Sequence, residues 1–192
     1  MKPTQSILII LSLFFISNCG DKDGEYTQYY ENGQIKSERN YKDGNGRLIT
    51  YFDNGQIEYD RNYKDGELDG KWTHYYRNGQ IKGESNFKDG KRDGKSTSYN
   101  ENGQKSNETN YKDGKKDGKW TLYHENGQRR SEENYKNGKW DGKWTYYYEN
   151  GQIKEEGNLK KGWWKKDGKW TTYNEDGSIE KVEEYKDGEL VK

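Results

Sequence analysis

Acidic side chains recur along the chain at a spacing that would suit hydrolysis of a glycosidic bond. They occupy one position of a repeating pattern, at Glu38, Asp60, Glu84, Glu108, Glu132 and Glu156. If each lies at the same place in successive β-hairpins, neighbouring carboxylates are two strands apart, or roughly 9 to 10 Å. That distance is at the edge of the separation between the two carboxylates of inverting glycosidases. Six equivalent acids, each near a lysine, favour instead a ladder of ion pairs across the strands.

Other residues with catalytic or metal-binding chemistry are sparse. His74 and His124 occupy different positions of the pattern, where other copies hold Thr, Ser, Asn or Tyr, so we expect two exposed side chains without a catalytic role. The Asp-Gly-Lys-x-Asp-Gly segments at 89–94 and 113–118 bring aspartates together, but calcium needs more oxygen ligands and fewer lysines than they offer. The sequence has no phosphate loop, nucleophile elbow or zinc signature. It therefore predicts a non-enzymatic protein with no catalytic residue, metal site or cofactor.

The single cysteine follows an apolar segment typical of an exported protein. Apolar and small residues run from Ile7 to Ser17, too short for a stable membrane anchor and right for a signal-peptide core. With Cys19 close behind, residues 1–18 resemble a bacterial lipoprotein signal peptide, although Asn18 departs from the small residue usual before the lipidated cysteine. The resemblance implies an exported chain, lipid-anchored through Cys19 on the periplasmic or outer surface, with residues 19–22 as the lipidated cysteine and a short tether. An ordinary signal peptide with an incidental cysteine is the alternative.

Composition points to a sheet protein without a nucleic-acid partner. Of the 192 residues 35% are charged, and Lys+Arg and Asp+Glu balance at 34 each. Nucleic acid and anionic lipid, as obligate partners, both need a basic excess that this chain lacks. The chain has no alanine, 24 glycines and 18 tyrosines, which disfavours helices and favours strands.

A unit of about 24 residues repeats seven times over residues 23–192. Its Asn-Gly pairs (Asp-Gly in the last copy) end at Gly33, Gly55, Gly79, Gly103, Gly127, Gly151 and Gly177. Asn-Gly between β-favouring runs predicts a two-residue type I′ hairpin turn, because both central residues need positive φ. That turn would pair Tyr30 with Ile35 and Tyr29 with Lys36. The second glycine-rich segment of each unit, such as 88–94, would be a longer connection to the next hairpin.

The glycine-spaced unit resembles the MORN-repeat superfamily, and specifically its bacterial variant found in YwqK-type antitoxin-like proteins. The resemblance covers about residues 23 to 190 and implies an all-β fold. Tandem β-hairpin repeats would form an elongated, twisted, single-layer antiparallel meander after the N-terminal signal segment. One hairpin alone is marginal, whereas repetition adds stability with each copy.

Period-two alternation sorts each hairpin into two faces. The aromatic face is defined by a tryptophan column and a tyrosine/phenylalanine column, and we expect an isoleucine column with them. The scaffold aromatics are Trp72, Trp120, Trp144 and Trp170, with Tyr41, Tyr63, Phe87, Tyr111, Tyr135 and Tyr185; the isoleucines are Ile35, Ile57, Ile81, Ile153 and Ile179. The opposite face carries a tyrosine in every repeat together with the acidic column, and we call it the tyrosine–glutamate face.

Three tryptophans fall outside these columns. Trp163 and Trp164 occupy a two-residue insertion in the sixth connection, and Trp140 occupies the preceding connection. Exposed tryptophans beside lysines suit a contact site for a protein, a sugar or a membrane interface. The alternative is that they cap the open end of the sheet, since terminal repeats need covering.

These observations lead us to expect a membrane-anchored, non-enzymatic scaffold that binds a protein, or a glycan, at the bacterial cell envelope. The resemblance to YwqK-type proteins implies an alternative, a toxin-neutralising antitoxin or immunity protein. The expected partner is a toxin or an envelope protein. The membrane would be contacted through the lipid on Cys19.

Overall fold

The described part of the protein is a single antiparallel β-sheet of fifteen strands, and the prediction of a hairpin-repeat meander is confirmed. The computed structural model describes residues 23–160, 163 and 165–191. The strands are β1 (Gly24–Tyr29), β2 (Ile35–Lys42), β3 (Asn45–Tyr51), β4 (Ile57–Lys64), β5 (Glu67–Tyr75), β6 (Ile81–Lys88), β7 (Lys91–Tyr99), β8 (Lys105–Lys112), β9 (Lys115–Tyr123), β10 (Arg129–Lys136), β11 (Lys139–Tyr147), β12 (Ile153–Leu159), β13 (Lys166–Tyr173), β14 (Ile179–Lys186) and β15 (Glu189–Leu190). The expected signal segment, Cys19 and Trp164 lie outside the described residues.

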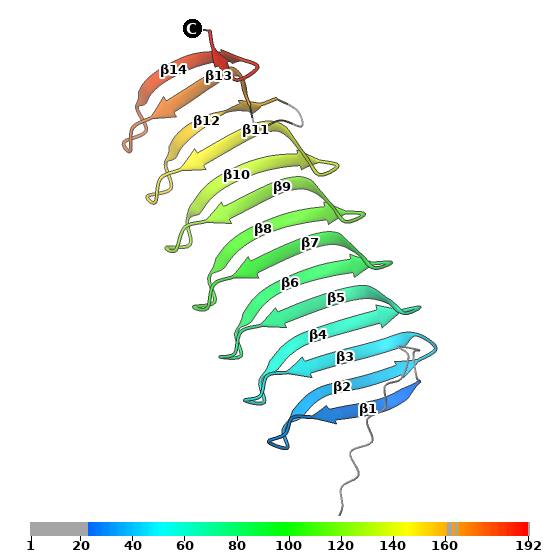
Figure 1. The fold of residues 1–192 in the computed structure, drawn as a ribbon. Coiled ribbons are helices and arrows are strands. Elements are labelled where there is room, and N and C mark those ends of the chain that lie inside the picture. The colour runs from blue at the N-terminus through cyan, green and yellow to red at the C-terminus, as the bar shows by residue number, and fades with distance from the viewer. Residues whose placement is uncertain (1–22, 161–162, 164, 192) are drawn as a thin grey trace, which may run out of the picture.

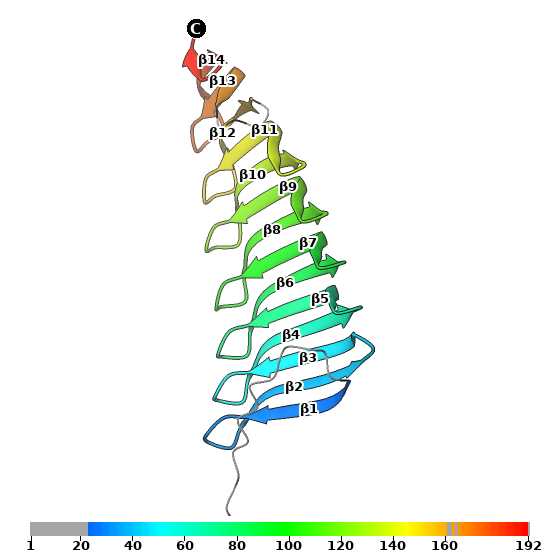
Figure 2. The same cartoon turned by 45° about the vertical axis from the view of Figure 1, so that its right-hand side comes forward.

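Each strand pairs only with its neighbours in the sequence, so the sheet order runs from β1 to β15. Figure 1 shows the strands stacked in chain order, with the turns along two long sides of the ribbon. Figure 2 shows that the curved strands form one layer, and no second sheet or helix from the described residues packs on it. The described part of the chain has no helix with the length and apolar character needed to cross a membrane.

The Asn-Gly turns are longer than the sequence suggested. Tyr30 N donates to Gln34 O (2.8 Å) and Gly33 N donates to Tyr30 O (2.9 Å), which leaves a three-residue loop. Only the glycine of the Asn-Gly pair has positive φ (83°), while Asn32 Oδ1 accepts a hydrogen bond from Gln34 N (3.0 Å). The prediction of a type I′ turn here is wrong, because a type I turn followed by a left-handed glycine fits the same dipeptide.

The tight two-residue turns lie instead at the other ends of the strands. Lys42 pairs directly with Asn45, and both residues between them have positive φ, 51° at Asp43 and 74° at Gly44. The same arrangement recurs at 65–66, 89–90, 113–114, 137–138 and 187–188. The expected long connections are therefore type I′-like hairpin turns, because aspartate tolerates the left-handed region nearly as well as asparagine does.

The turn geometry moves the isoleucine column to the tyrosine–glutamate face. Tyr29 pairs with Ile35 and Gln28 with Ser37, so Lys36 is the extra residue of a bulge. Directly paired residues share a face. The expectation that isoleucine joins the aromatic face is therefore wrong. The bulge turns Ile35 to the opposite face, and the strand pairs regain the expected register from Gln28 and Ser37 onward.

The tryptophan and tyrosine/phenylalanine columns do share the aromatic face. Ring centroids of Trp72 and Phe87 are 6.2 Å apart, and those of Trp170 and Tyr185 are 6.5 Å apart, both edge to face. The core is thin: none of the described side chains is less than 2% exposed, and Trp170 at 3% is the most buried aromatic among them. Half-buried rings covering one another, rather than a second layer, therefore stabilise the sheet.

Candidate binding face

The aromatic face is organised around one cross-strand row through the middle of the sheet. Odd-numbered strands place one residue of each repeat in this row: Tyr26, Leu48, Trp72, Ser96, Trp120, Trp144 and Trp170. Even-numbered strands place Arg39, Arg61, Ser85, Thr109, Glu133, Gly157 and Glu183 between them. Large rings thus alternate with shorter or flexible side chains, which lets each ring lie across its neighbouring strand.

Cations lie over the rings of this row. Lys116 Nζ is 3.1 Å from the ring centroid of Trp120 and 4.7 Å from that of Tyr135. Burial against these rings lowers the pKa of Lys116. Lys166 Nζ likewise lies 4.2 Å from the centroid of Trp170. Cation–π contact therefore adds to the stability of the face.

Trp140 occupies the position that Lys116 has in the preceding repeat. It lies within β11 and pairs with Tyr135, whose ring centroid is 5.8 Å away. Its Nε1 donates to Glu133 Oε2 (3.0 Å), which also accepts from Tyr135 Oη (2.9 Å). The expectation that Trp140 lies in a connection outside the columns is wrong, because the tight Asn137-Gly138 turn makes its position part of the strand. Its role as a contact with a partner stays a prediction.

A polar hollow interrupts the row in the middle of the sheet. It lies between Trp72 and Trp120, where Ser96 takes the place that a large side chain has in the other repeats, and has a volume of about 360 Å³. We call it the central hollow. Ser85, Ser96 and Thr109 form its floor, and Arg92 and Lys116 are among its lining residues. Its lining combines aromatic side chains with hydroxyl groups and positive charge.

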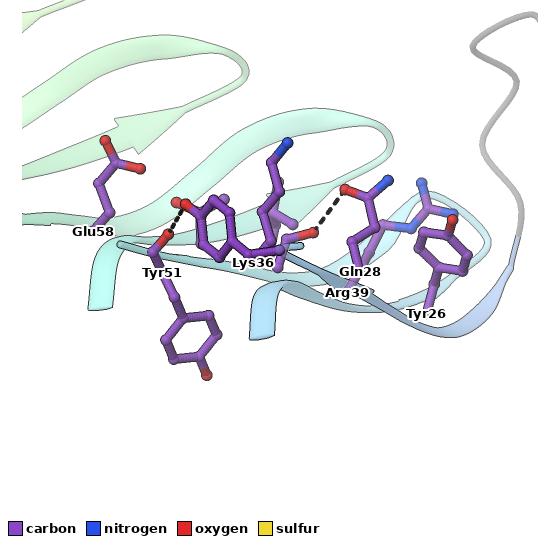
Figure 3. A pocket seen from close by; sticks show the side chains of 10 residues that line it. Tyr26, Gln28, Lys36, Arg39, Tyr51 and Glu58 are labelled. Carbon is purple, nitrogen blue, oxygen red and sulfur yellow. Dashed lines mark hydrogen bonds between the residues drawn. The ribbon is translucent and has the colours of Figure 1, made fainter. Parts of the chain in front are cut away.

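A second hollow of about 360 Å³ lies at the N-terminal end of the same face. Figure 3 shows Tyr26, Gln28, Lys36 and Arg39 around it, while the ring of Tyr51 points away to the other face. The Arg39 guanidinium is 5.9 Å from the centroid of the Tyr26 ring. Tyr26 belongs to the edge strand β1 and is 54% exposed. This hollow is thus open at the sheet edge, whereas the central hollow is flanked by strands on both sides.

The tyrosine–glutamate face holds five members of the acidic column in ion pairs, as predicted: Asp60, Glu84, Glu108, Glu132 and Glu156. Glu38 instead accepts a hydrogen bond from Tyr51 Oη (2.5 Å). Lys119 Nζ and Arg129 Nη1 each lie 3.2 Å from Glu132 Oε1, and Tyr147 Oη donates to Glu132 Oε2 (3.0 Å). Burial alone would raise the pKa of Glu132, but these hydrogen bonds outweigh it and lower the pKa. Burial and the bond to Glu132 raise the pKa of Tyr147 to about 12. A carboxylate held ionised by three partners is suited to cross-strand pairing rather than to proton transfer.

The glutamates of other repeats follow the same scheme. Lys95 Nζ pairs with Glu108 (2.9 Å), Lys143 Nζ pairs with Glu156 (2.6 Å), and Tyr173 Oη donates to Glu156 (2.9 Å). The tyrosine partner was not foreseen, although its recurrence in every repeat is a signal that the sequence contains. Within residues 23–160, 163 and 165–191 no cluster of three or more His, Cys, Asp or Glu side chains could hold a metal ion.

Both histidines belong to the repeat scaffold, so the expectation of two exposed side chains is wrong. His74 is half-buried and stacks on Tyr59 with ring centroids 4.3 Å apart, and burial lowers its pKa. His124 Nε2 lies 3.1 Å from Tyr147 O. Tyr76 and Tyr148 make the equivalent bond to a carbonyl of the next repeat (2.8 and 2.9 Å).

The turn asparagines form a second link between repeats that sequence reasoning missed. Asn126 Nδ2 donates to Glu149 O (2.7 Å) in the next turn, and Asn32, Asn54, Asn78 and Asn150 make the corresponding bonds at 2.9 to 3.3 Å. The recurrence of asparagine rather than aspartate at this position is the signal, because only the amide can donate.

Trp163 is the described member of the tryptophan insertion. Its side chain is 64% exposed, and its backbone N–H donates to Lys160 O (2.9 Å). Trp164 and Cys19 lie outside the described residues. Of the described candidate contact tryptophans, Trp140 lies within β11 on the aromatic face, and Trp163 follows the end of β12.

The fold and this face define a tandem β-hairpin repeat protein with an uncovered aromatic face. A family model described as the MORN repeat variant matches residues 22–43, 45–65, 68–89, 92–113, 116–137, 140–161 and 166–187. These matches cover more than half of the chain, which therefore belongs to the MORN repeat variant family. Repeats of this family generally act as non-catalytic scaffolds for binding.

Comparison with curated proteins finds no relative. Among solved structures, one similar chain is that of the GtfA/B complex bound to UDP and GlcNAc, at 15% identity and a TM-score of 0.25. The alignment covers 70% of this chain and 27% of that chain, so this protein spans about a quarter of its length. A likeness at that TM-score carries no argument about fold or function.

Proposed function

We propose that this protein is a lipid-anchored scaffold that uses its aromatic face to bind a protein or glycan at the bacterial cell envelope. The observation that carries the proposal is the uncovered aromatic face. Its half-buried rings extend over the sheet with no second layer on them among the described residues (Figure 2). A large, partly apolar surface rimmed by charge is typical of an interaction site.

The membrane anchor rests on the sequence alone. The apolar segment ends close to Cys19, and β1 begins at Gly24, so a lipid on the cysteine would hold the sheet near the membrane surface. Fractionation of cells that produce the whole chain tests this step. We expect the parent in the membrane fraction and a Cys19→Ser variant outside it; equal recovery of both in the membrane would refute lipid anchoring through this residue.

The binding function is tested by capture from the envelope fraction of the source cell. The baits are residues 20–192, a Trp72→Ala/Trp120→Ala variant of the aromatic face, and a Trp163→Ala/Trp164→Ala variant of the insertion. Loss of one captured molecule with the first variant places the contact on the aromatic face, and loss with the second places it at the insertion. Capture of a toxin that is neutralised on co-expression would favour the antitoxin function. Equal recovery with all three baits would contradict both placements.

A further inference from the structure

The central hollow exists because one repeat departs from the others at a structural position. Six repeats place a tyrosine, leucine or tryptophan in the central row, and the fourth repeat places Ser96 there. The residues beside it in the row, Ser85 and Thr109, are also small. Trp72 and Trp120 consequently stand four strands apart, roughly 19 Å, with polar groups between them.

The floor of the hollow contains an unsatisfied polar group. Thr109, one of the lining residues, is 3% exposed, and its buried Oγ1 has no hydrogen-bond partner among the described residues. Ser85 Oγ and Ser96 Oγ are bonded to each other at 2.7 Å. A buried hydroxyl without a partner is uncommon in a folded protein, because its desolvation is not offset. The half-buried Ser96, Ser98 and Ser106 also line the hollow, and their hydroxyls are the ones that a ligand with hydroxyl groups of its own could bond.

The hollow carries positive charge in a chain whose charges otherwise balance. Its 18 lining residues, all within the described segment 72–120, include Lys82, Arg92 and Lys116 and no aspartate or glutamate. Arg92 is exposed and lies 5.3 Å from the Tyr111 ring centroid. Glu133, which faces Trp120 from β10, is engaged by Tyr135 and Trp140. Arg92 presents the planar fork of donors that suits a carboxylate.

We propose that the central hollow binds an acidic oligosaccharide, a short chain of sugar rings that carry carboxylates. The indole rings of Trp72 and Trp120 would pack on the apolar faces of sugar rings. The hydroxyls of the half-buried serines that line the hollow would bond the sugar hydroxyls, and Arg92 would pair with a carboxylate. A peptide fits less well, because the lining offers no aliphatic pocket for side-chain anchors. The proposal rests on the scaffold function and specifies its ligand and site.

The test measures binding to residues 20–192 by titration calorimetry. The probes are tetragalacturonate, neutral maltotetraose, a tetraglutamate peptide and inorganic sulfate. We expect tetragalacturonate to bind, and each of the others to bind at least about tenfold more weakly. Tetragalacturonate alone offers sugar rings to the tryptophans, hydroxyl groups to the serines and carboxylates to the cations. Binding should weaken as salt screens the exposed cations.

Two variants and a control locate the site. Ser96→Trp installs the residue that four other repeats carry, so the fold should persist while the hollow fills and tetragalacturonate binding is lost. Val182→Trp makes a matched insertion at an exposed position of β14 on the tyrosine–glutamate face and should leave binding unchanged. Arg92→Gln should weaken binding about ten- to hundredfold, the equivalent of one charged hydrogen bond. Circular dichroism checks that each variant is folded.

Three results would overturn the proposal. These are absence of tetragalacturonate binding, equal binding by the folded Ser96→Trp variant, and equal binding of the tetraglutamate peptide, which would define an acidic-peptide site instead. Failure here is distinguishable from failure of the scaffold function. If tetragalacturonate does not bind but the aromatic-face variant loses an envelope partner, only the ligand assignment is wrong.

Discussion

Adding a single methyl group at Gly157 should destabilise the C-terminal repeats. A Cβ built on this glycine would lie 2.6 Å from Trp170 Cγ and closer still to two further atoms of the indole. Trp170 is 3% exposed, and its Nε1 donates to Asn158 O (3.1 Å), so the ring cannot turn aside without losing contacts and that bond. Overpacking of a filled site costs about 1–3 kcal/mol, and a lost hydrogen bond about 1 kcal/mol. We expect Gly157→Ala to lower the free energy of unfolding by about 2 kcal/mol.

Gly83→Ala provides the matched control on β6. Its added Cβ would meet its nearest neighbour, Thr97 O, at 3.5 Å, an ordinary contact, and neither glycine has positive φ. Removing backbone freedom from the unfolded chain should therefore leave stability unchanged or raise it by about 0.5 kcal/mol. The difference between the two variants isolates the overlap with Trp170, because the chemical change is the same in both.

Urea unfolding followed by tryptophan fluorescence measures this difference in residues 20–192. A repeat array can unfold in segments, so hydrogen exchange of the β12–β14 amides should accompany it. Faster exchange confined to those strands is expected for Gly157→Ala. Equal urea midpoints for the two glycine variants, with unchanged exchange in β12–β14, would refute the view that close ring packing stabilises the sheet.

Three further predictions address the turns, the charges and the insertion. Asn126→Ala should lower the free energy of unfolding in urea by about 1 kcal/mol, because it loses the hydrogen bond to the next turn. Asn102→Ala should lower it less, since Asn102 Nδ2 bonds within its own turn. Equal losses in the two variants would contradict the inter-repeat link. The lowered pKa of Glu132 means that its ionised form stabilises the fold. Its contribution to stability should be full at neutral pH and fall as the pH drops below about 4. Urea unfolding at pH 7 and pH 3 tests this, and the loss of stability should be smaller in Glu132→Gln. Trp163→Ala should change stability by no more than about 0.5 kcal/mol, because its side chain is exposed; a larger loss would identify it as a cap.

The sequence was sufficient for the architecture because one signal repeats in register. The glycine-spaced unit recurs seven times, and in each copy period-two alternation places residues such as Trp72 and Phe87 on one face. Every copy therefore predicts the same hairpin, so an error in one copy does not change the result. The positions of the two kinds of turn were predicted the wrong way round, however: the longer turns lie at Asn-Gly and the two-residue turns at the other ends of the strands. Asn-Gly and Asp-Gly both satisfy the need for positive φ, and the dipeptide does not show whether one residue or two will adopt it. That choice placed Ile35 on the wrong face and Trp140 outside its strand.

The candidate site was harder to predict because it is defined by an omission. The tryptophans of the insertion stand out in the sequence as unusual residues, whereas the hollow depends on Ser96, an ordinary residue at a position where a large one is the rule. Its neighbours in space, Ser85 and Thr109, come from adjacent strands and are 11 and 13 positions away in the chain. Only the cross-strand register brings the three side chains and Arg92 to one place.

In a repeat array, a residue that departs from the repeated type at a structural position has a cost in stability. In an array where each repeat contacts only its neighbours, the residue that stabilises one copy should stabilise every copy. Serine in place of a half-buried tryptophan at position 96 forgoes about 2 kcal/mol of apolar burial, and Thr109 next to it adds an unsatisfied hydroxyl. Two local losses side by side, in the only run of three consecutive row positions without a large or charged side chain among the described residues, run against stability. A site that gains hydrogen-bond and stacking partners from a ligand accounts for the small residues at these positions.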